Sequence, residues 1–342
     1  GLSRSRGGPP KNLIVWLLFL LPVIVFTVSL SLGRYEISAL DVLRVLLSPI
    51  YPDLASDIPE IAQQLILRVR LPRILGALLI GASFGGTGTA FQAIFKNPLV
   101  DSNILGVTSG AGFGAAIALL LMRSGWEIQV SAFVFGLIAV FMAFFGSKLY
   151  RSTPLLILTL MGILVGSLFS SLTSLLKYVA DPLDTLPAIT FWLLGSLTAV
   201  TWDRLLFLSI TTIIGLAFLL SIRWRLNILS LGEAEARALG LEPEKMKLLI
   251  IVFATMMTAS AVSVSGVIGW VGLVIPHAGR LLVGPDHKRL LPVSIFLGAS
   301  FLMLIDDIAR TFLPGEIPLG VLTGLIGVPI LILLLRRSQS WW

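Results

Sequence analysis

The stretch LIVWLLFLLPVIVF, residues 13–26, decides the class of fold, because none of its side chains is charged or strongly polar. Similar runs recur along the 342-residue chain, which is 56% hydrophobic and 13% charged, with a mean hydropathy of +0.97. Soluble proteins carry roughly 25% charged residues. This composition predicts a helical protein that crosses the membrane several times and excludes a soluble enzyme, a disordered chain and a nucleic-acid-binding domain. Residues 13–26 do not alternate between polar and apolar, which also excludes a transmembrane β-barrel.

Working outward from this run, we expect an all-α protein with ten membrane-spanning helices. The predicted spans are 13–32, 65–94, 99–121, 128–147, 154–178, 203–222, 246–266, 268–283, 291–310 and 319–335. Most of the 25 Lys and Arg residues fall in loops on the side of the N-terminus, so the positive-inside rule places both termini in the cytoplasm. We interpret the apolar segment 179–201, which is bordered by aspartates, as a short outer helix along the membrane surface.

The spans predict a single transmembrane domain over residues 1–342, with a cytoplasmic tail at 1–12 and a polar cytoplasmic loop at 223–245. A second polar segment, 34–64, is placed outside. Glycines four residues apart share one face of a helix and let membrane helices approach closely. The glycine pairs that predict such packing are Gly81 and Gly85, Gly110 and Gly114, Gly162 and Gly166, and Gly320 and Gly324.

Motifs for catalysis or nucleotide binding are missing from the sequence. There is no G-x-x-x-x-G-K-[ST] phosphate loop, no H-E-x-x-H and no G-x-S-x-G. The chain has no cysteine and two histidines, His277 and His287, so we predict no catalytic residue, no bound cofactor and no metal site. A membrane enzyme would need a polar cluster at one face, for which the candidates are Asp306 and Asp307 with Arg310, and His277 with Arg280.

The motif RVRLPR, residues 68–73, lies at the outer mouth of the second predicted helix. Arginines are costly near the membrane unless they reach water or an acidic partner. Two interpretations stay open for Arg68, Arg70 and Arg73. They are either interfacial anchors whose head groups reach the water, or a docking point for carboxylates on an extracytoplasmic partner.

Three further motifs predict local structure. Asn97-Pro98 predicts the end of a helix and a turn, and Pro276 lies within a predicted helix next to His277, for which we favour a structural hydrogen bond. In ILSLGEAEARALGLEPEK, residues 228–245, Gly232 precedes a helical stretch and Gly240 stands where a C-terminal cap belongs. This short inner helix is offered to a soluble partner or lies on the lipid surface.

Together these motifs resemble the FecCD family, the permease subunits of ABC importers for iron–siderophore, haem and cobalamin. The resemblance rests on R-L-P-R at 70–73, N-P-L…L-G-V-x-S-G-A at 97–111, L-G-x-x-x-A-x-x-L-G at 231–240, S-G-x-I-x-[FW]-V-G-L-x-[IV]-P-H-x-x-R at 265–280, G-x-D-H-[KR] at 284–288, D-x-x-A-R at 306–310 and E-[LI]-P-[LV]-G at 316–320. Trp270 replaces a commoner Phe, and Asp101-Ser102 replaces Asp/Glu-Pro, so the third helix is expected to begin differently.

The resemblance implies a homodimer of ten-helix subunits in the inner membrane of a prokaryote. A binding protein would dock outside, and two ATPase subunits carrying ATP and Mg would dock inside. Arg70, Arg73 and Arg310 match the family arginines that pair with acidic residues of the binding protein. The residues that match the coupling helix, which sits in a groove of the ATPase, are Leu231, Gly232, Glu233, Ala236, Arg237, Leu239 and Gly240. Asn97, Pro98, Pro276 and His277 would form structural turns near the path.

Cargo and mechanism follow from the same resemblance. Ferric siderophores are the leading cargo, with haem, cobalamin and an oxyanion such as molybdate left open. The sparse intramembrane charge suits a bulky chelate better than a bare ion. The chain itself would be a transporter subunit and no enzyme. The alternatives are a carrier coupled to an ion gradient, which would need intramembrane acidic residues, and an integral membrane enzyme.

Overall fold

The structure is a computed structural model that describes residues 11–35, 37–122, 125–149 and 155–337, and most of these residues are helical. Most of the predicted tail at 1–12 lies outside the described residues. The α-helices are α1 Lys11–Ser31, α2 Ala39–Leu47, α3 Glu60–Gln64, α4 Leu71–Phe95, α5 Val107–Leu120, α6 Trp126–Lys148, α7 Leu155–Val179, α8 Thr185–Leu194, α9 Trp202–Ser221, α10 Arg223–Leu231, α11 Glu233–Ala238, α12 Pro243–Ser265, α13 Val271–Val283, α14 His287–Thr311 and α15 Leu319–Arg337. A π-helical turn, Leu65–Arg70, leads into α4, and short 3₁₀ turns occur at Pro52–Ala55 and Ser102–Leu105.

Each predicted span coincides with one of these helices over most of its length, but among the described residues fewer than ten helices have the length and composition of a membrane span. Among the described residues, six qualify: α6, α7, α9, α12, α14 and α15. The predicted segments 99–121 and 268–283 were too long, because α5 has 14 residues and α13 has 13. Asp101 caps the 3₁₀ turn before α5 by accepting from Asn103 N at 3.0 Å, and α5 begins at Val107, well after the predicted start of this span at residue 99.

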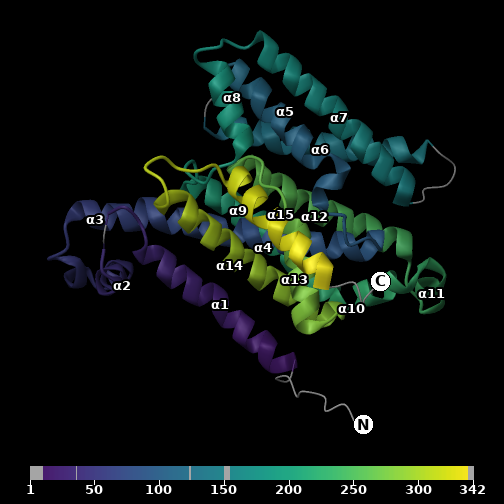
Figure 1. Ribbon diagram of the computed structural model, residues 1–342, viewed down its shortest axis with the longest axis horizontal. Helices are drawn as coiled ribbons and strands as arrows, with labels where there is room; N and C mark the ends of the chain where they lie inside the picture. Colours follow the sequence, from purple (N-terminus) through teal and green to yellow (C-terminus); the bar gives the residue numbers. More distant parts are fainter. Residues whose placement is uncertain (1–10, 36, 123–124, 150–154, 338–342) are drawn as a thin grey trace.

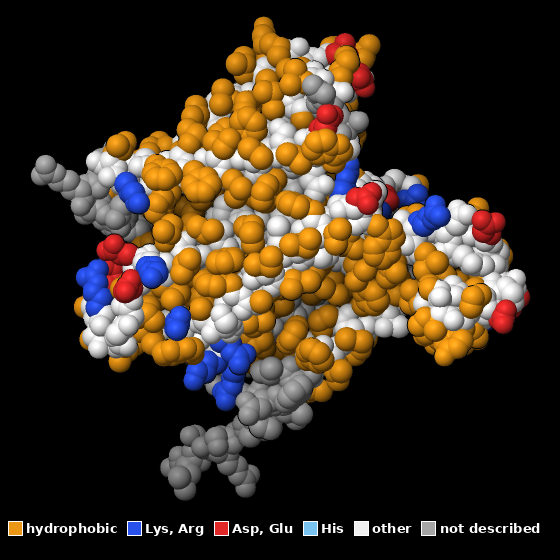
Figure 2. Space-filling model, turned by 180° about the vertical axis from the view of Figure 1, so that it is seen from behind, with side chains coloured by type: hydrophobic (Ala, Val, Ile, Leu, Met, Phe, Trp, Pro, Cys, Tyr) orange, Lys and Arg blue, Asp and Glu red, His pale blue; other side chains and the backbone are white. Residues whose placement is uncertain are grey.

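Helix α4 forms the centre of the bundle. It packs against α14, α13, α12 and α9, and every residue from Ile80 to Phe95 is buried. Helices α5, α6 and α7 pack on one another as a separate layer, and α1 lies along α14 on the opposite side (Figure 1). The space-filling view shows apolar side chains over most of the middle of one face and charged side chains toward its edges (Figure 2). This distribution matches a bundle surrounded by lipid.

The paired glycines allow direct contact between helix backbones, as predicted. A Cβ atom at Gly81 would lie 2.1 Å from the carbonyl oxygen of Gly298, and one at Gly85 would lie 2.2 Å from that of Ser294. Equivalent backbone contacts are made by Gly110, Gly114, Gly162 and Gly320. Gly166 and Gly324 are different, because a methyl group there would make only ordinary van der Waals contacts. Close approach therefore fixes α4 to α14 and α5 to α6.

Two segments outside the predicted spans are also helical. The polar segment 34–64 contains α2 and α3, and Ser38 caps α2 by accepting from Asp41 N at 3.1 Å. Helix α8 lies within 179–201, as expected, and its 10 residues are too short to cross a membrane. It contacts α5 and α15 and buries Ile189, so it is a packed element of the protein, and its place along the outer membrane surface stays a prediction.

Candidate functional site

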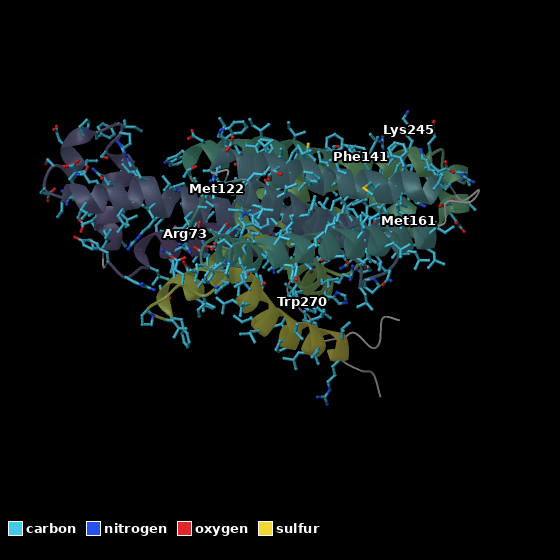
Figure 3. All side chains as sticks on the ribbon, turned by 90° about the horizontal axis from the view of Figure 1, so that it is seen from above. Arg73, Met122, Phe141, Met161, Lys245 and Trp270 are labelled. Carbon is cyan, nitrogen blue, oxygen red and sulfur yellow. The ribbon has the colours of Figure 1, made fainter. Side chains whose placement is uncertain are left out.

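The predicted docking arginines and the predicted coupling segment lie at opposite ends of the bundle. Figure 3 places Arg73 at one end, and Lys245, which follows α11, at the other. Arg70 is the last residue of the π-helical turn, Arg73 lies in the first turn of α4, and Arg310 lies in the last turn of α14. The fold thus brings together two arginines that are close in sequence and a third from 237 residues further along the chain.

Arg73 is 7% exposed and forms ion pairs with two carboxylates. Its Nη2 lies 2.9 Å from Asp306 Oδ1, and its Nη1 lies 2.8 Å from Glu316 Oε1. Asp306 is 1% exposed, whereas the side chain of Glu316 is 37% exposed. The guanidinium therefore connects α4, α14 and the loop before α15, and Glu316 is the member of the group that water can reach.

Arg310 and Arg70 are also satisfied from within the chain. Arg310 pairs with Asp307 and donates to the carbonyl oxygens of Ser29 and Leu32 at the end of α1. Ser29 in turn donates its hydroxyl to Asp307 Oδ2 at 2.6 Å. Arg70 donates to backbone carbonyl oxygens, including that of Leu30 at 2.9 Å. The three guanidinium groups thus tie the end of α1 to α4 and α14.

Neither sequence interpretation of these arginines describes this network. Arg70 and Arg73 are not anchors that reach the water, because both are at least nine-tenths buried, as is Arg310. The sequence grouped Asp306 and Asp307 with Arg310, and the D-D-x-x-R spacing at 306–310 does place both carboxylates one turn from it. The pairing of Arg73 with Asp306 and Glu316 was not predicted. Docking of a binding protein on these arginines stays a prediction. Arg68, which belongs to the same motif, is exposed.

The predicted coupling segment is built from two helices that meet at Gly232. The backbone of Gly232 has φ +152°, which separates α10 from α11. Gly240 has φ +78°, and its N–H donates to Arg237 O while that of Leu241 donates to Ala236 O. This is the Schellman arrangement, so Gly240 caps α11 as predicted. The short inner helix predicted after Gly232 is α11, and a further helix, α10, precedes Gly232.

Ionic contacts hold α11 against the beginning of α12. Glu233 Oε1 accepts from Lys247 Nζ, and this hydrogen bond lowers the pKa of the Glu233 carboxyl below its ordinary value. Arg237 lies 3.5 Å from carboxylate oxygens of both Glu233 and Glu244. Ala236, which belongs to α11, is fully buried. In contrast, the side chains of Leu231 and Leu239 are 63% and 61% exposed. The pair is thus a fixed element that presents apolar side chains at one end of the bundle.

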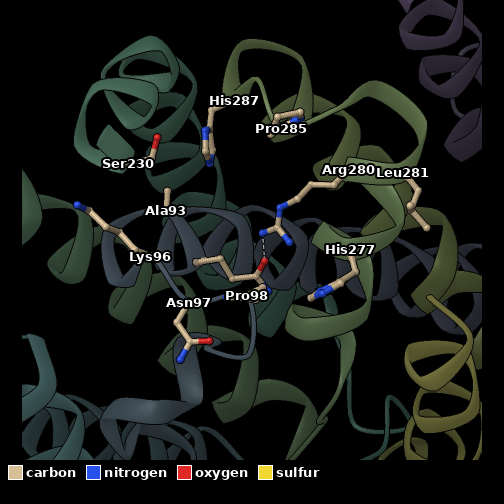
Figure 4. Close-up of a pocket in the computed structure, with 11 residues that line it drawn as sticks. Ala93, Lys96, Asn97, Pro98, Ser230, His277, Arg280, Leu281, Pro285 and His287 are labelled. Carbon is tan, nitrogen blue, oxygen red and sulfur yellow. Dashed lines mark hydrogen bonds between the residues drawn. The ribbon is translucent and has the colours of Figure 1, made fainter. Parts of the chain in front are cut away.

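The predicted turns lie close together at the same end. Helix α4 ends at Phe95, Lys96 takes a left-handed conformation with φ +49°, and Asn97 Oδ1 accepts from Leu99 N at 2.9 Å. Asn97, Pro98 and His277 line one cavity, which Figure 4 shows together with Arg280 and His287. His277 makes the structural hydrogen bond that was expected, since its Nδ1 lies 3.2 Å from Leu273 O.

The alternative functions gain no site from this geometry. Among the described residues no group of three or more His, Cys, Asp or Glu side chains could hold a metal ion. Asp306 and Asp307, which a membrane enzyme or an ion-coupled carrier would need, are both paired with arginines.

Comparison with known proteins gives a consistent result. Residues 20–337 match the model of the FecCD transport family. The chain is 42% identical over 317 residues to the molybdate import system permease protein MolB of Haemophilus influenzae, covering 93% of each chain. It is 39% identical over 283 residues to the cobalamin import system permease protein BtuC of Halobacterium salinarum, covering 82% of this chain and 76% of the relative.

A solved structure, described as an inward-facing conformation of a metal-chelate type ABC transporter, superposes with a TM-score of 0.86 at 40% identity. The superposition covers 95% of this chain and 99% of that one. The family match spans nearly the whole described bundle, including both ends discussed above. The chain belongs to the FecCD transport family.

Proposed function

We propose that this chain is the membrane-spanning permease subunit of an ABC importer, and that it performs no covalent chemistry itself. ATP and Mg would bind to two separate ATPase subunits, which dock on α10 and α11. The observation that carries the proposal is the pair Leu231 and Leu239, exposed on a segment that capping and ion pairs hold in place. ATP binding and hydrolysis would shift the permease between two states because the partners bind those states with different affinity.

We infer the orientation in the membrane from the charge distribution and from where the chain ends lie. The start of α1 and the end of α15 point toward the α10–α11 end of the bundle (Figure 1). With the positive-inside rule, this supports a cytoplasmic location for both termini and for the α10–α11 end. The arginine network would then face the outside of an inner membrane, where a binding protein delivers the cargo. The ten predicted spans would be the six long apolar helices together with α1, α4, α5 and α13.

Helix α7 supports a homodimer with the translocation path between the copies. It is the least buried of the six long apolar helices. It also exposes four hydroxyl side chains at helical spacing, Ser167, Ser170, Ser171 and Ser174. Beside them lies a shallow cavity of about 520 Å³ that Gly106, Gly162 and Gly166 also line. A cavity lined mainly by glycines and serines suits the passage of a bulky polar cargo better than contact with lipid.

The cargo is proposed as a metal chelate or a metal oxyanion. Sequence analysis put ferric siderophores first, and the relatives at 35–42% identity are named for molybdate, iron chelatin, cobalamin and hemin transport. Molybdate joins the ferric chelates as a leading candidate, because the relative named for it matches 93% of this chain at 42% identity. Among described residues, the intramembrane carboxylates Asp306 and Asp307 are paired with arginines, so neither of these two is free to hold a bare cation.

The coupling role is tested by binding of the ATPase encoded beside this chain to detergent-solubilised variants. Leu239→Ser and Leu231→Ser remove exposed apolar contacts, so ATPase binding should weaken tenfold or more while the thermal unfolding temperature stays unchanged. Leu40→Ser is the matched control, because Leu40 is 67% exposed on α2 at the other end. ATPase binding that all three variants retain would contradict the coupling role.

The homodimer is tested by crosslinking, for which a chain without cysteine gives no background. Ser170→Cys in membranes should yield a crosslinked dimer with a short bismaleimide, whereas Leu40→Cys should stay monomeric. Equal crosslinking of both variants, or of neither, would contradict the dimer through α7.

A further inference from the structure

Helix α2 carries apolar side chains on two opposite faces. Val42 and Val45 are buried against the rest of the protein. Leu40, Leu43 and Leu47 are 67%, 54% and 39% exposed, and their spacing of three and four residues places them together on another face of the helix. We call these three leucines the α2 stripe. None of the functions assigned above uses this surface.

The α2 stripe continues into the turn that follows the helix. The N–H of Tyr51 donates to Leu47 O at 2.9 Å, so the chain keeps its helical path for one more turn. Ile50 and Tyr51 follow Leu47 at helical spacing, and they are 70% and 62% exposed. The exposed apolar surface therefore runs from residue 40 to residue 51. Continuous apolar surface of this kind is rarely left in contact with water, so it indicates an interaction site.

The α2 stripe lies next to the apolar surface of α1. Between residues 13 and 32 the chain has no charged side chain, and the exposed side chains of α1 include Val23 and Val28. Tyr35, which follows the end of α1, is 47% exposed, and tyrosine is enriched where a membrane meets water. Helix α2 begins four residues later and contacts α1. Figure 1 shows α2 beside the end of α1, at the end of the bundle that carries the arginine network.

The distribution of polar side chains at this end has a direction. Figure 2 shows the α2 end of the molecule on the right, seen from behind. Hydrophobic side chains there run back toward the middle of the bundle, whereas acidic side chains lie at the extreme tip. An interfacial helix has this arrangement, with its apolar side directed into the membrane and its charged neighbours directed into water.

The charge of the region favours apolar contact with lipid over electrostatic binding. Residues 38–61, all of which the structure describes, contain one basic residue, Arg44, and four acidic ones, Asp41, Asp53, Asp57 and Glu60. Arg44 forms ion pairs with Asp41 and Asp57. Peripheral helices that bind membranes through charge are rich in Lys and Arg. This region has no unpaired cation for a lipid phosphate or for a carboxylate of a binding protein, and what it offers is aliphatic surface.

We propose that α2 is an interfacial helix of the outer leaflet, with lipid acyl chains against Leu40, Leu43 and Leu47 and with Tyr51 among the head groups. The partner is the lipid surface, which is recognised through apolar area and not through head-group charge. Helices of this kind bury their apolar face about 5–10 Å into the boundary between head groups and acyl chains. Beside the end of α1, α2 would set the depth of the bundle in the membrane. The choice of the outer leaflet rests on the proposed function, whereas the contact with lipid does not.

The test uses the full-length chain in phosphatidylcholine liposomes. Because the chain has no cysteine, Leu43→Cys, Val23→Cys and Ser56→Cys each accept a single nitroxide label. Collisions of the label with oxygen and with a water-soluble nickel chelate are measured by power saturation. Val23 on α1 is the reference for lipid, and Ser56, which is exposed at the same end as α2, is the reference for water. All three side chains are exposed, so the labels should leave the core unchanged.

We expect the ratio of oxygen to nickel collisions at Leu43 to be at least threefold above that at Ser56, and to stay the same when phosphatidylglycerol replaces part of the lipid. A ratio equal to that at Ser56, or one that rises only with phosphatidylglycerol, would overturn the proposal. Protection of Leu43 that appears only with the binding protein would make the α2 stripe a protein docking surface, and spin–spin broadening would place a second copy on it. Either result overturns contact with lipid. A Val23 label in water would overturn the proposed membrane arrangement together with this inference, whereas Leu43 alone in water overturns only the inference.

Discussion

Arg73 on α4 and Asp306 on α14 form a buried ion pair, with Nη2 of the arginine 2.9 Å from Oδ1 of the carboxylate. The pair joins the central helix to its most extensive neighbour, and Glu316 extends it toward the surface. Removing one partner of a buried pair leaves an uncompensated charge. The arginines at this end of the bundle therefore have a structural role, whatever partner docks beside them.

Reversing the charge at Arg73 should destabilise the protein. Arg73→Glu would place a third carboxylate beside Asp306 and Glu316, and we expect a loss of about 3–5 kcal/mol, the usual cost of breaking a buried pair. Thermal unfolding in detergent measures this. Arg68→Glu is the control, because the exposed Arg68 can change without a buried partner. If Arg73→Glu unfolds like the wild type but loses affinity for the binding protein, Arg73 is a docking residue and the structural role is wrong.

The contact between α4 and α14 depends on glycine at position 298. A Cβ atom there would lie 2.2 Å from the carbonyl oxygen of Gly81, so the helices must separate in Gly298→Ala. We expect the free energy of unfolding to fall by about 2 kcal/mol or more, because overpacking typically costs about 1–3 kcal/mol and occasionally more. Gly324→Ala should be neutral, because its Cβ would be 3.6 Å from the nearest atom. Equal unfolding temperatures for the two variants would refute this packing.

The cap of α11 gives a smaller, separable effect. Gly240 has φ +78° and open space around its Cα, so a side chain there meets conformational strain but no clash. Gly240→Ala should cost about 1 kcal/mol, and Gly240→Asn should cost less because asparagine tolerates this conformation. Hydrogen exchange at the amides of α11 measures the difference. Identical exchange in the two variants would show that the left-handed conformation at position 240 does not determine the stability of the cap.

The junction between α11 and α12 should weaken in acid. The hydrogen bond from Lys247 lowers the pKa of Glu233 in the folded protein below its ordinary 4.5. A lowered pKa means that the contribution to stability is present above the unfolded value and is lost as the pH falls through the folded value. Hydrogen exchange of α11 should therefore accelerate below pH 4.5. Glu233→Gln should remove this dependence, and a variant that keeps it would assign the effect to another group.

The sequence predicted the class of fold and the glycine contacts well, because apolar runs and small residues at four-residue spacing depend on local pattern. It failed where tertiary contacts decide. No feature of the sequence near Arg73 indicates that Asp306 and Glu316 form ion pairs with it. An arginine at a membrane boundary was therefore interpreted as available to a partner protein. The lengths of α5 and α13 were overestimated for a similar reason, since Gly106 and Trp270 adopt left-handed conformations that hydropathy does not register.

The central claim is that this chain moves cargo only as part of an ATP-driven complex. The most direct measurement is uptake into proteoliposomes that contain the chain with its genomically neighbouring ATPase and binding protein. Ferric siderophore, molybdate, cobalamin and haem would each be supplied as cargo. We predict that one of them accumulates, that accumulation stops without ATP, and that Leu239→Ser strongly reduces it. Accumulation of a cargo by the chain alone, driven by an ion gradient and without ATP, would contradict the account.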